Sequence, residues 1–239
     1  MTNTAELKRD LADTFFLADL LGYSEGICNH FSVAVSGEEE LYLINPYGVH
    51  WSEMRPHHLL LIDGDGRVLE GEGEVEASAR YIHVAGHRAN SRHRAILHTH
   101  MPYATALTMV EGGKLEMAHQ TAIPFWGRMS HHTFGGFALD ETEGTRIAEA
   151  QQDNQHADIF FLDNHGVTVG AESIAEAFDD LYYLERACRQ QVLAQSTGLP
   201  LKLIAEEMVQ KAYLQSRQNR ALYAETHFRT LQRIHSPDT

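Results

Sequence analysis

The sequence predicts an α/β protein with a mostly antiparallel sheet, and three observations support this prediction. Apolar residues recur at helical spacing over residues 3–22 and 173–197. Short apolar or alternating segments at residues 40–44 and 59–63 are typical of strands. The sequence Asp-Gly-Asp-Gly at residues 63–66 is a hairpin signal, so strands in this half follow one another through turns and do not form a βαβ series.

The first predicted helix, residues 3–22, has both of its ends marked in the sequence. Asn3 and Glu6 have the spacing of a capping box, and Gly22 ends the helix. Residues 24–35 follow as a glycine-containing turn that leads into a strand.

The middle of the chain is expected to alternate between short strands and helices. Residues 67–69 return from the hairpin, and the acidic, glycine-rich residues 70–76 form a loop. Residues 77–90 are predicted to be helical, and residues 94–97 form a short strand that enters the core. A Met-Pro pair then breaks this strand, and a helix follows at residues 103–110.

The C-terminal half begins with one long connection, residues 112–136. Structureless connections of this length in compact domains are typically functional or mobile. Without repeats or a break in composition, we expect one domain over residues 1–239. The remaining predicted elements are a helix at 140–151, strands at 158–162 and 167–169, and helices at 173–197, 201–216 and 221–234.

Charge and cysteine content exclude several classes of partner. A formal net charge of −14 argues against nucleic acid and anionic membranes, which require basic surfaces. Cys28 and Cys188 lie far apart in unrelated settings, which argues against a disulfide framework and favours a reducing compartment. The chain has no apolar run near the roughly 20 residues of a membrane span and a polar N-terminus, so we expect a cytoplasmic protein.

The sequence His-Thr-His at residues 98–100 is the first candidate site. Alternate residues of a strand share a face, so His98 and His100 point the same way from the end of the strand at residues 94–97. Two imidazoles at this spacing can reach one metal ion. Because the chain contains 16 histidines, the pair alone is weak support, and its weight depends on the motifs around it.

Five segments in the same order resemble the class II aldolase/adducin family over nearly the whole chain. They are GICNHFS at 26–32, NPYGVHWSE at 45–53, HTHMPYATAL at 98–107, NHG at 164–166 and EAFDDLYYLERACRQQ at 176–191. The resemblance implies an α/β/α sandwich around a mostly antiparallel central sheet. It also implies a homotetramer with active sites between subunits. The apolar faces of the last two predicted helices, which include Met208, Leu222 and Phe228, are further reason to expect an oligomer.

The resemblance implies a metal site made of His98, His100 and His165. Three protein ligands with an open position are typical of a catalytic metal. We expect one divalent ion, with zinc as the first choice and manganese, cobalt or iron as alternatives. It would chelate a substrate hydroxyl and carbonyl and hold the enediolate left when a carbon–carbon bond breaks.

The sequence departs from the family pattern at the acid/base position. Sugar-phosphate aldolases of the family carry an acidic residue nineteen positions before the first metal histidine, and this position is Ala79 here. Glu76, one helical turn earlier, is a candidate replacement, and the alternative is a first-turn glutamate that favours the helix dipole. The position of the family's tyrosine proton donor is His131, which is either a proton donor in altered form or a solvated loop histidine.

The candidate substrate-binding residues are Asn29, His30, Gly48 and Ser78. The family's pair of serines near the substrate phosphate is reduced here to Ala77 and Ser78, so a carbonyl or carboxylate substrate without phosphate is as well supported as a phosphorylated one.

Three functions are considered for this sequence. The first is a metal-dependent lyase that performs retro-aldol cleavage or decarboxylation of a small hydroxy-carbonyl or carboxylate compound through a metal-stabilised enolate. The second is a non-haem Fe(II) oxygenase that uses the same three histidines, since an oxygenase does not need the acid missing at Ala79. The third is an adducin-like interaction module, which the presence of all three metal histidines disfavours.

Overall fold

The computed structural model describes residues 3–35, 40–136, 145–146, 149 and 154–235. Eight strands form one sheet: β1 (His30–Ala34), β2 (Leu41–Ile44), β3 (Leu60–Asp63), β4 (Val68–Glu70), β5 (Ala95–Thr99), β6 (Met129–His132), β7 (Ile159–Leu162) and β8 (Gly166–Ala171). Their order is β4-β3-β2-β1-β5-β8-β7-β6, and every neighbouring pair is antiparallel except β6 and β7. The prediction of an α/β fold around a mostly antiparallel sheet is confirmed.

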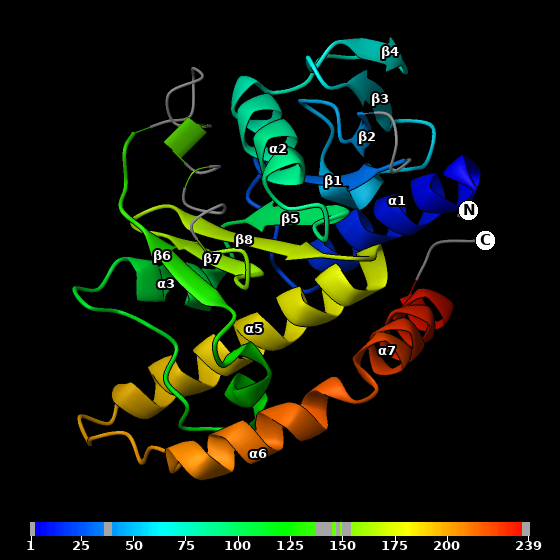
Figure 1. Cartoon of the computed structure of the whole chain (residues 1–239). Helices are drawn as coiled ribbons and strands as arrows, with labels where there is room; N and C mark the ends of the chain where they lie inside the picture. Colours follow the sequence, from blue (N-terminus) through cyan, green and yellow to red (C-terminus); the bar gives the residue numbers. More distant parts are fainter. Residues whose placement is uncertain (1–2, 36–39, 137–144, 147–148, 150–153, 236–239) are drawn as a thin grey trace.

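The helices cover both faces of this sheet (Figure 1). The α-helices are α1 (Thr4–Leu20), α2 (Ala77–Ala89), α3 (Pro102–Thr108), α5 (Ile174–Gln195), α6 (Glu206–Arg217) and α7 (Arg220–His235), with short 3-10 turns η1 (Trp51–Glu53) and η2 (Gln120–Phe125). Helix α2 lies on one face, while α1, α3 and α5 lie on the other, α7 packs on the outside of α5, and α6 packs against η2. Within the described residues, no helix has both the length and the apolar character needed to cross a membrane.

Local signals set the ends of the helices, largely as predicted. The Asn3 side chain accepts a hydrogen bond from the Ala5 N–H (3.1 Å) at the start of α1, and Ser173 accepts one from the Glu176 N–H (3.2 Å) at the start of α5. Pro102 occupies the first turn of α3, where its missing N–H costs nothing. Helix α6 begins at Glu206, later than the predicted residue 201.

The main apolar core lies between the sheet and α1, α3 and α5. Phe15 of α1 stacks on Phe31 of β1 with ring centroids 4.7 Å apart, and Phe178 of α5 packs on Phe228 of α7 at 5.6 Å. Phe228 is fully buried, so its prediction as part of a surplus surface face is wrong. The residue contributes to the chain's own core because α7 folds back onto α5.

The predicted connection at residues 112–136 contains two elements that were not predicted from the sequence. Residues 120–125 form η2, and Met129–His132 form the edge strand β6, which pairs in parallel with β7 through Met129 and Ile159. The segment Met-Ser-His-His is short and mostly polar, so neither alternation nor an apolar run marks it as a strand. Most of the predicted helix at residues 140–151 lies outside the described residues, and the three residues of it that are described, 145, 146 and 149, are helical.

Alternation along β1 places polar side chains under α2. Phe31 and Val33 belong to the main core, whereas His30 and Ser32 contact residues of α2 on the other face. His98 of β5 is the register partner of His30, so it projects from the same face. This face carries the candidate site.

Candidate metal centre

Three histidines converge where β5 ends and where β7 turns into β8. One ring nitrogen of each of His98, His100 and His165 lies within 4.8 Å of the other two. The ring centroids are 4.9 Å apart for His98 and His165, 4.9 Å for His100 and His165, and 5.2 Å for His98 and His100. The structure therefore brings together the three residues that the family resemblance singled out as metal ligands.

The turn that carries His165 depends on its two neighbours. Asn164 has a φ of 55°, a left-handed conformation that asparagine adopts more readily than most residues. At Gly166, a Cβ atom would lie 2.5 Å from Cδ2 of His100 and 2.8 Å from the Thr99 carbonyl oxygen. Because no larger residue fits there, Gly166 allows β8 to begin directly against His100 and keeps His165 beside the other two rings.

The hydrogen bonds of the cluster leave nitrogens free to bind a cation. His98 Nδ1 lies 3.1 Å from the Val167 carbonyl, to which it donates, so Nε2 is the nitrogen with the lone pair. His100 Nδ1 pairs with the Glu25 carboxylate, while His100 Nε2 is buried without a hydrogen-bond partner among the described residues. Carboxylate or carbonyl contacts of this kind are typical of metal-bound histidines. These residues fit a divalent metal.

Electrostatics favours the neutral form of the buried ligand. Burial holds the pKa of His98 well below its ordinary value of 6.5, and the neighbouring rings of His30, His165 and His100 lower it further. A metal binds only the unprotonated imidazole nitrogen, so the environment keeps His98 in the form that binds metal.

Glu76 lies at the start of α2 without capping the helix. Its carboxylate accepts a hydrogen bond from the Ser78 hydroxyl (2.8 Å), and its Oε2 is 3.9 Å from His30 Nε2. His30 in turn stacks on His98 with ring centroids 4.9 Å apart. Three candidate residues thus form a group beside the cluster. Ala79 is buried among apolar side chains and supplies no proton-transfer group.

The other two candidate substrate-binding residues lie directly before β1 and in the turn after β2. Asn29 is 3% exposed, and its side-chain oxygen accepts a hydrogen bond from the His100 N–H (3.3 Å). Asn29 therefore helps to hold the backbone of His100, one of the candidate metal ligands, in place. Gly48 has a φ of +88° in an exposed turn, a conformation that glycine adopts without strain.

His131 is not one of the three histidines that converge in the cluster. It lies in β6, three strands from β5, which corresponds to about 14 Å at the usual strand spacing. Its ring stacks on Phe161 with centroids 4.8 Å apart, and burial lowers its pKa. It lines a cavity of about 370 Å³ together with residues of the 108–114 segment and with Asp163 and Asn164, which precede His165 in the chain.

Two parts of the site were not predicted from the sequence. Glu25 contacts His100 across seventy-five positions of the chain, and no local spacing marks such a pair. His83 and His87 lie one turn apart in α2, under His30 and Ser32 of β1. Their spacing of four residues is a signal for a shared helix face that could have been recognised.

Comparisons with known proteins agree with this architecture. The model of the Class II Aldolase and Adducin N-terminal domain matches residues 9–192. A protein of Pseudomonas aeruginosa, provisionally named an aldolase class 2 protein, is 32% identical over 193 residues, which cover 80% of this chain and 73% of that protein.

Two solved structures share the fold over nearly the whole chain. An aldolase II superfamily protein from Pseudomonas syringae is 31% identical with a TM-score of 0.87, and the match covers 98% of this chain and 94% of that one. L-fuculose 1-phosphate aldolase from Glaciozyma antarctica has a TM-score of 0.83 at 22% identity, with 98% and 93% covered, which shows a common fold. Together with the family match, these likenesses show that the chain belongs to the class II aldolase and adducin family.

Proposed function

We propose that this protein is a metal-dependent lyase that cleaves a carbon–carbon bond of a small hydroxy-carbonyl or carboxylate compound, by retro-aldol cleavage or decarboxylation. The observation that carries the proposal is the cluster of His98, His100 and His165, with the partnerless His100 Nε2 at its centre. A bound divalent ion would polarise a substrate carbonyl and stabilise the negative charge that develops beside it. Zinc is our first choice, because three histidines with an open position are a common catalytic zinc site.

The residues around the cluster supply the remaining roles in this proposal. Glu76, which is about one-third exposed, is the proposed proton acceptor beside the ligands. His30, Ser78, Asn29 and Gly48 are the proposed lining of the substrate site. His131 is not part of the three-histidine cluster, so we propose that it acts as a proton donor at the metal centre of another subunit.

A homotetramer with active sites between subunits is part of the proposal. Several apolar side chains of the last two helices are exposed in the single chain, with exposed fractions of 52% for Met208, 66% for Leu214 and 64% for Leu222. The cytoplasm is the proposed location, supported by the free thiols of Cys28 and Cys188.

The proposed substrate class rests on the name of a similar protein and on a position where this chain differs from the family pattern. One structural neighbour is an L-fuculose 1-phosphate aldolase. Ala77 replaces the first serine of the pair that the family places near the substrate phosphate. We therefore propose a substrate that need not carry phosphate, and a test must compare both forms.

A second candidate function is an Fe(II) oxygenase with the same three ligands. The observation that favours it is Ala79, which lies buried in an apolar cluster where the family's aldolases carry an acid. An oxygenase does not require that proton shuttle.

Elemental analysis and isotope exchange distinguish these functions. Protein purified without a chelating tag should contain about one zinc per chain, and His165→Ala should lose most of it, whereas His131→Ala should retain it. The zinc protein should exchange deuterium from D₂O into the carbon next to the carbonyl of hydroxyacetone or its phosphate. Bound iron with turnover that consumes oxygen would support the oxygenase. Full metal occupancy in His165→Ala would refute the assigned ligand set.

A further inference from the structure

A continuous chain of buried polar side chains runs under α2, from the metal centre to the loop before β5. His30 Nδ1 lies 2.8 Å from His83 Nε2, and His83 Nδ1 lies 2.5 Å from the Ser32 hydroxyl. The same hydroxyl lies 2.8 Å from His87 Nε2, and His87 Nδ1 lies 2.6 Å from the carbonyl oxygen of His93. The four side chains that form the chain are all at least nine-tenths buried.

The His93 carbonyl, at the end of this hydrogen-bonded chain, determines which nitrogen of His87 carries a proton. A backbone carbonyl can only accept a hydrogen bond, so His87 Nδ1 must carry the proton at 2.6 Å. Burial lowers the pKa of His87 to about 4, which leaves the ring neutral near pH 7 with this single proton. His87 Nε2 is therefore an acceptor, and the Ser32 hydroxyl donates to it.

The proton positions on Ser32, His83 and His30 follow in turn toward the metal centre. Since Ser32 uses its only hydrogen on His87, its oxygen accepts from His83 Nδ1–H. Burial also holds the pKa of His83 well below its ordinary value, so His83 Nε2 has a lone pair and accepts from His30 Nδ1–H. With all rings neutral, the reverse direction would place two lone pairs against each other between His87 and the His93 carbonyl.

We propose that this hydrogen-bonded chain of side chains holds His30 in one tautomer and presents its Nε2 as a hydrogen-bond acceptor for a substrate hydroxyl. The proposal rests on the proposed function, because it places that hydroxyl between His30 and the metal centre. Facing His30 Nε2 are the Ser78 hydroxyl at 3.4 Å and the Glu76 carboxylate at 3.9 Å. Ser78 donates to Glu76 at 2.8 Å, so the shorter bond uses its hydrogen and leaves the His30 lone pair for a ligand.

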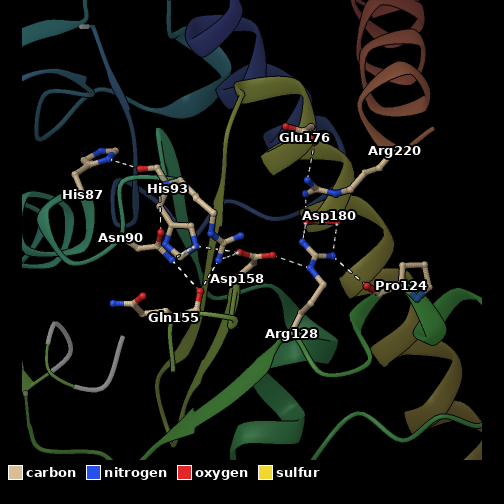
Figure 2. Close-up of polar contacts among 11 residues, drawn as sticks. His87, Asn90, His93, Pro124, Arg128, Gln155, Asp158, Glu176, Asp180 and Arg220 are labelled. Carbon is tan, nitrogen blue, oxygen red and sulfur yellow. Dashed lines mark hydrogen bonds and ion pairs between the residues drawn. The ribbon is translucent and has the colours of Figure 1, made fainter. Parts of the chain in front are cut away.

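The carbonyl that anchors the chain is itself held by an ion network. Figure 2 shows His87 directed at the His93 carbonyl, while the His93 ring contacts Asp158 with Nε2 and Oδ1 3.1 Å apart. Asp158 accepts from Arg128 Nε (2.7 Å), and Arg128 continues to Asp180 of α5. His83, Ser32 and His87 thus act as positioning residues between a rigid ion network and a residue of the substrate site.

The tautomers can be measured without knowledge of the substrate. We expect long-range ¹H–¹⁵N correlation spectra of zinc-loaded, ¹⁵N-histidine-labelled protein to show protons on Nδ1, and none on Nε2, for His30, His83 and His87. Neutron diffraction would give the same pattern. Free imidazole side chains favour the opposite tautomer, so this result would be specific to the chain. A proton on His30 Nε2 would overturn the proposal.

Substitution of Ser32 tests the function of the chain. We expect Ser32→Ala to leave zinc content unchanged, to mix the two tautomers of His30, and to weaken the binding of hydroxyacetone several-fold to about tenfold. Ser32→Thr retains the hydroxyl and should restore the wild-type tautomer and affinity. An unchanged His30 spectrum in Ser32→Ala would overturn the role of the chain. Wild-type protein that binds no zinc would refute the proposed function, while spectra of the metal-free protein would still decide the tautomers.

Discussion

Arg128 donates from Nη2 to Oδ2 of Asp180 across 2.5 Å, which joins the start of β6 to α5 in the interior. The same guanidinium donates from Nε to Asp158 (2.7 Å) and from Nη1 to the Pro124 carbonyl (3.1 Å) (Figure 2). All three charged side chains are at most 7% exposed. One cation therefore satisfies two buried anions from different layers of the fold.

Removal of this cation should destabilise the protein strongly. Among the described residues, Arg128→Ala leaves Asp158 with His93 and Arg92 as ion-pair partners and leaves Asp180 with Arg220, so we expect a loss of about 3–5 kcal/mol in the free energy of unfolding. Urea unfolding measures the loss. Arg67→Ala, at a side chain that is 76% exposed, serves as the control and should change stability by about 0.5 kcal/mol or less. Similar losses in both variants would contradict the proposed importance of the network.

The stability of the protein should decrease as the pH falls, because His87 is buried in the neutral form. Burial lowers its pKa from 6.5 to about 4. Below pH 6.5 the unfolded chain takes up a proton at this residue and the folded chain does not. The free energy of unfolding should therefore decrease by about 1.4 kcal/mol per pH unit between about pH 6.5 and 4 from this group alone. Above pH 6.5 this group does not make the free energy of unfolding depend on pH.

Unfolding titrations at a series of pH values test this prediction. His87→Phe removes the titrating group and keeps a ring next to Tyr42, on which His87 stacks at 4.6 Å. The variant should be less stable near pH 7, because it breaks the contact with Ser32, but its stability should depend less steeply on pH between 6.5 and 4. Parallel curves for the two proteins would refute the assignment to His87.

Glu25 should strengthen metal binding through His100. Its carboxylate contacts His100 Nδ1, which orients the ring and makes the opposite nitrogen a better ligand. Glu25→Gln should weaken zinc affinity about 10- to 100-fold, as measured by competition with a chromogenic chelator. Glu72→Gln, at an exposed residue of the loop after β4, is the matched control and should bind zinc as the wild type does. Equal affinities for both variants would exclude this role of Glu25.

Glu76 should affect proton transfer and leave the metal in place. Its carboxylate lies beside His30 and accepts from Ser78, so Glu76→Gln retains size and hydrogen bonding while it removes the charge. We expect deuterium exchange of the hydroxy-carbonyl probe to slow by about 100- to 10,000-fold with unchanged zinc content. Glu74→Gln, at an exposed neighbour, should exchange normally.

The other outcomes for Glu76→Gln are equally informative. Loss of zinc would make Glu76 a fourth ligand. Full exchange activity would mean that Glu76 is only a structural residue at the start of α2, and His131 would then be the candidate for proton transfer.

The oligomeric state can be measured directly. We expect light scattering at micromolar concentration to give about four times the mass of one chain, and Leu222→Glu on the exposed face of α7 to shift the distribution toward smaller species. The paired control is Arg67→Glu on an exposed hairpin. A stable monomer of the wild-type chain would contradict the tetramer and, with it, the proposed role of His131.

The sequence by itself determined the elements whose signals are local. Helix α5 was predictable because Ser173 caps it, its apolar residues recur at helical spacing and Gly198 follows its end with a φ of +73°. The two histidines at the end of β5 were predictable because alternation places them on one face, and the family resemblance added His165. Each of these signals depends on residues a few positions apart.

Only the tertiary structure decided which distant residues meet. The polar strand β6 forms because β7 is available to pair with it, and no pattern within Met129–His132 requires this. Glu25 reaches His100 because the turn before β1 lies against the end of β5. The chain from His30 to the His93 carbonyl exists because the register of β1 places Ser32 under α2 between His83 and His87. Pairing register and helix placement are cooperative properties of the packed core, so a linear reading of the sequence does not contain these contacts.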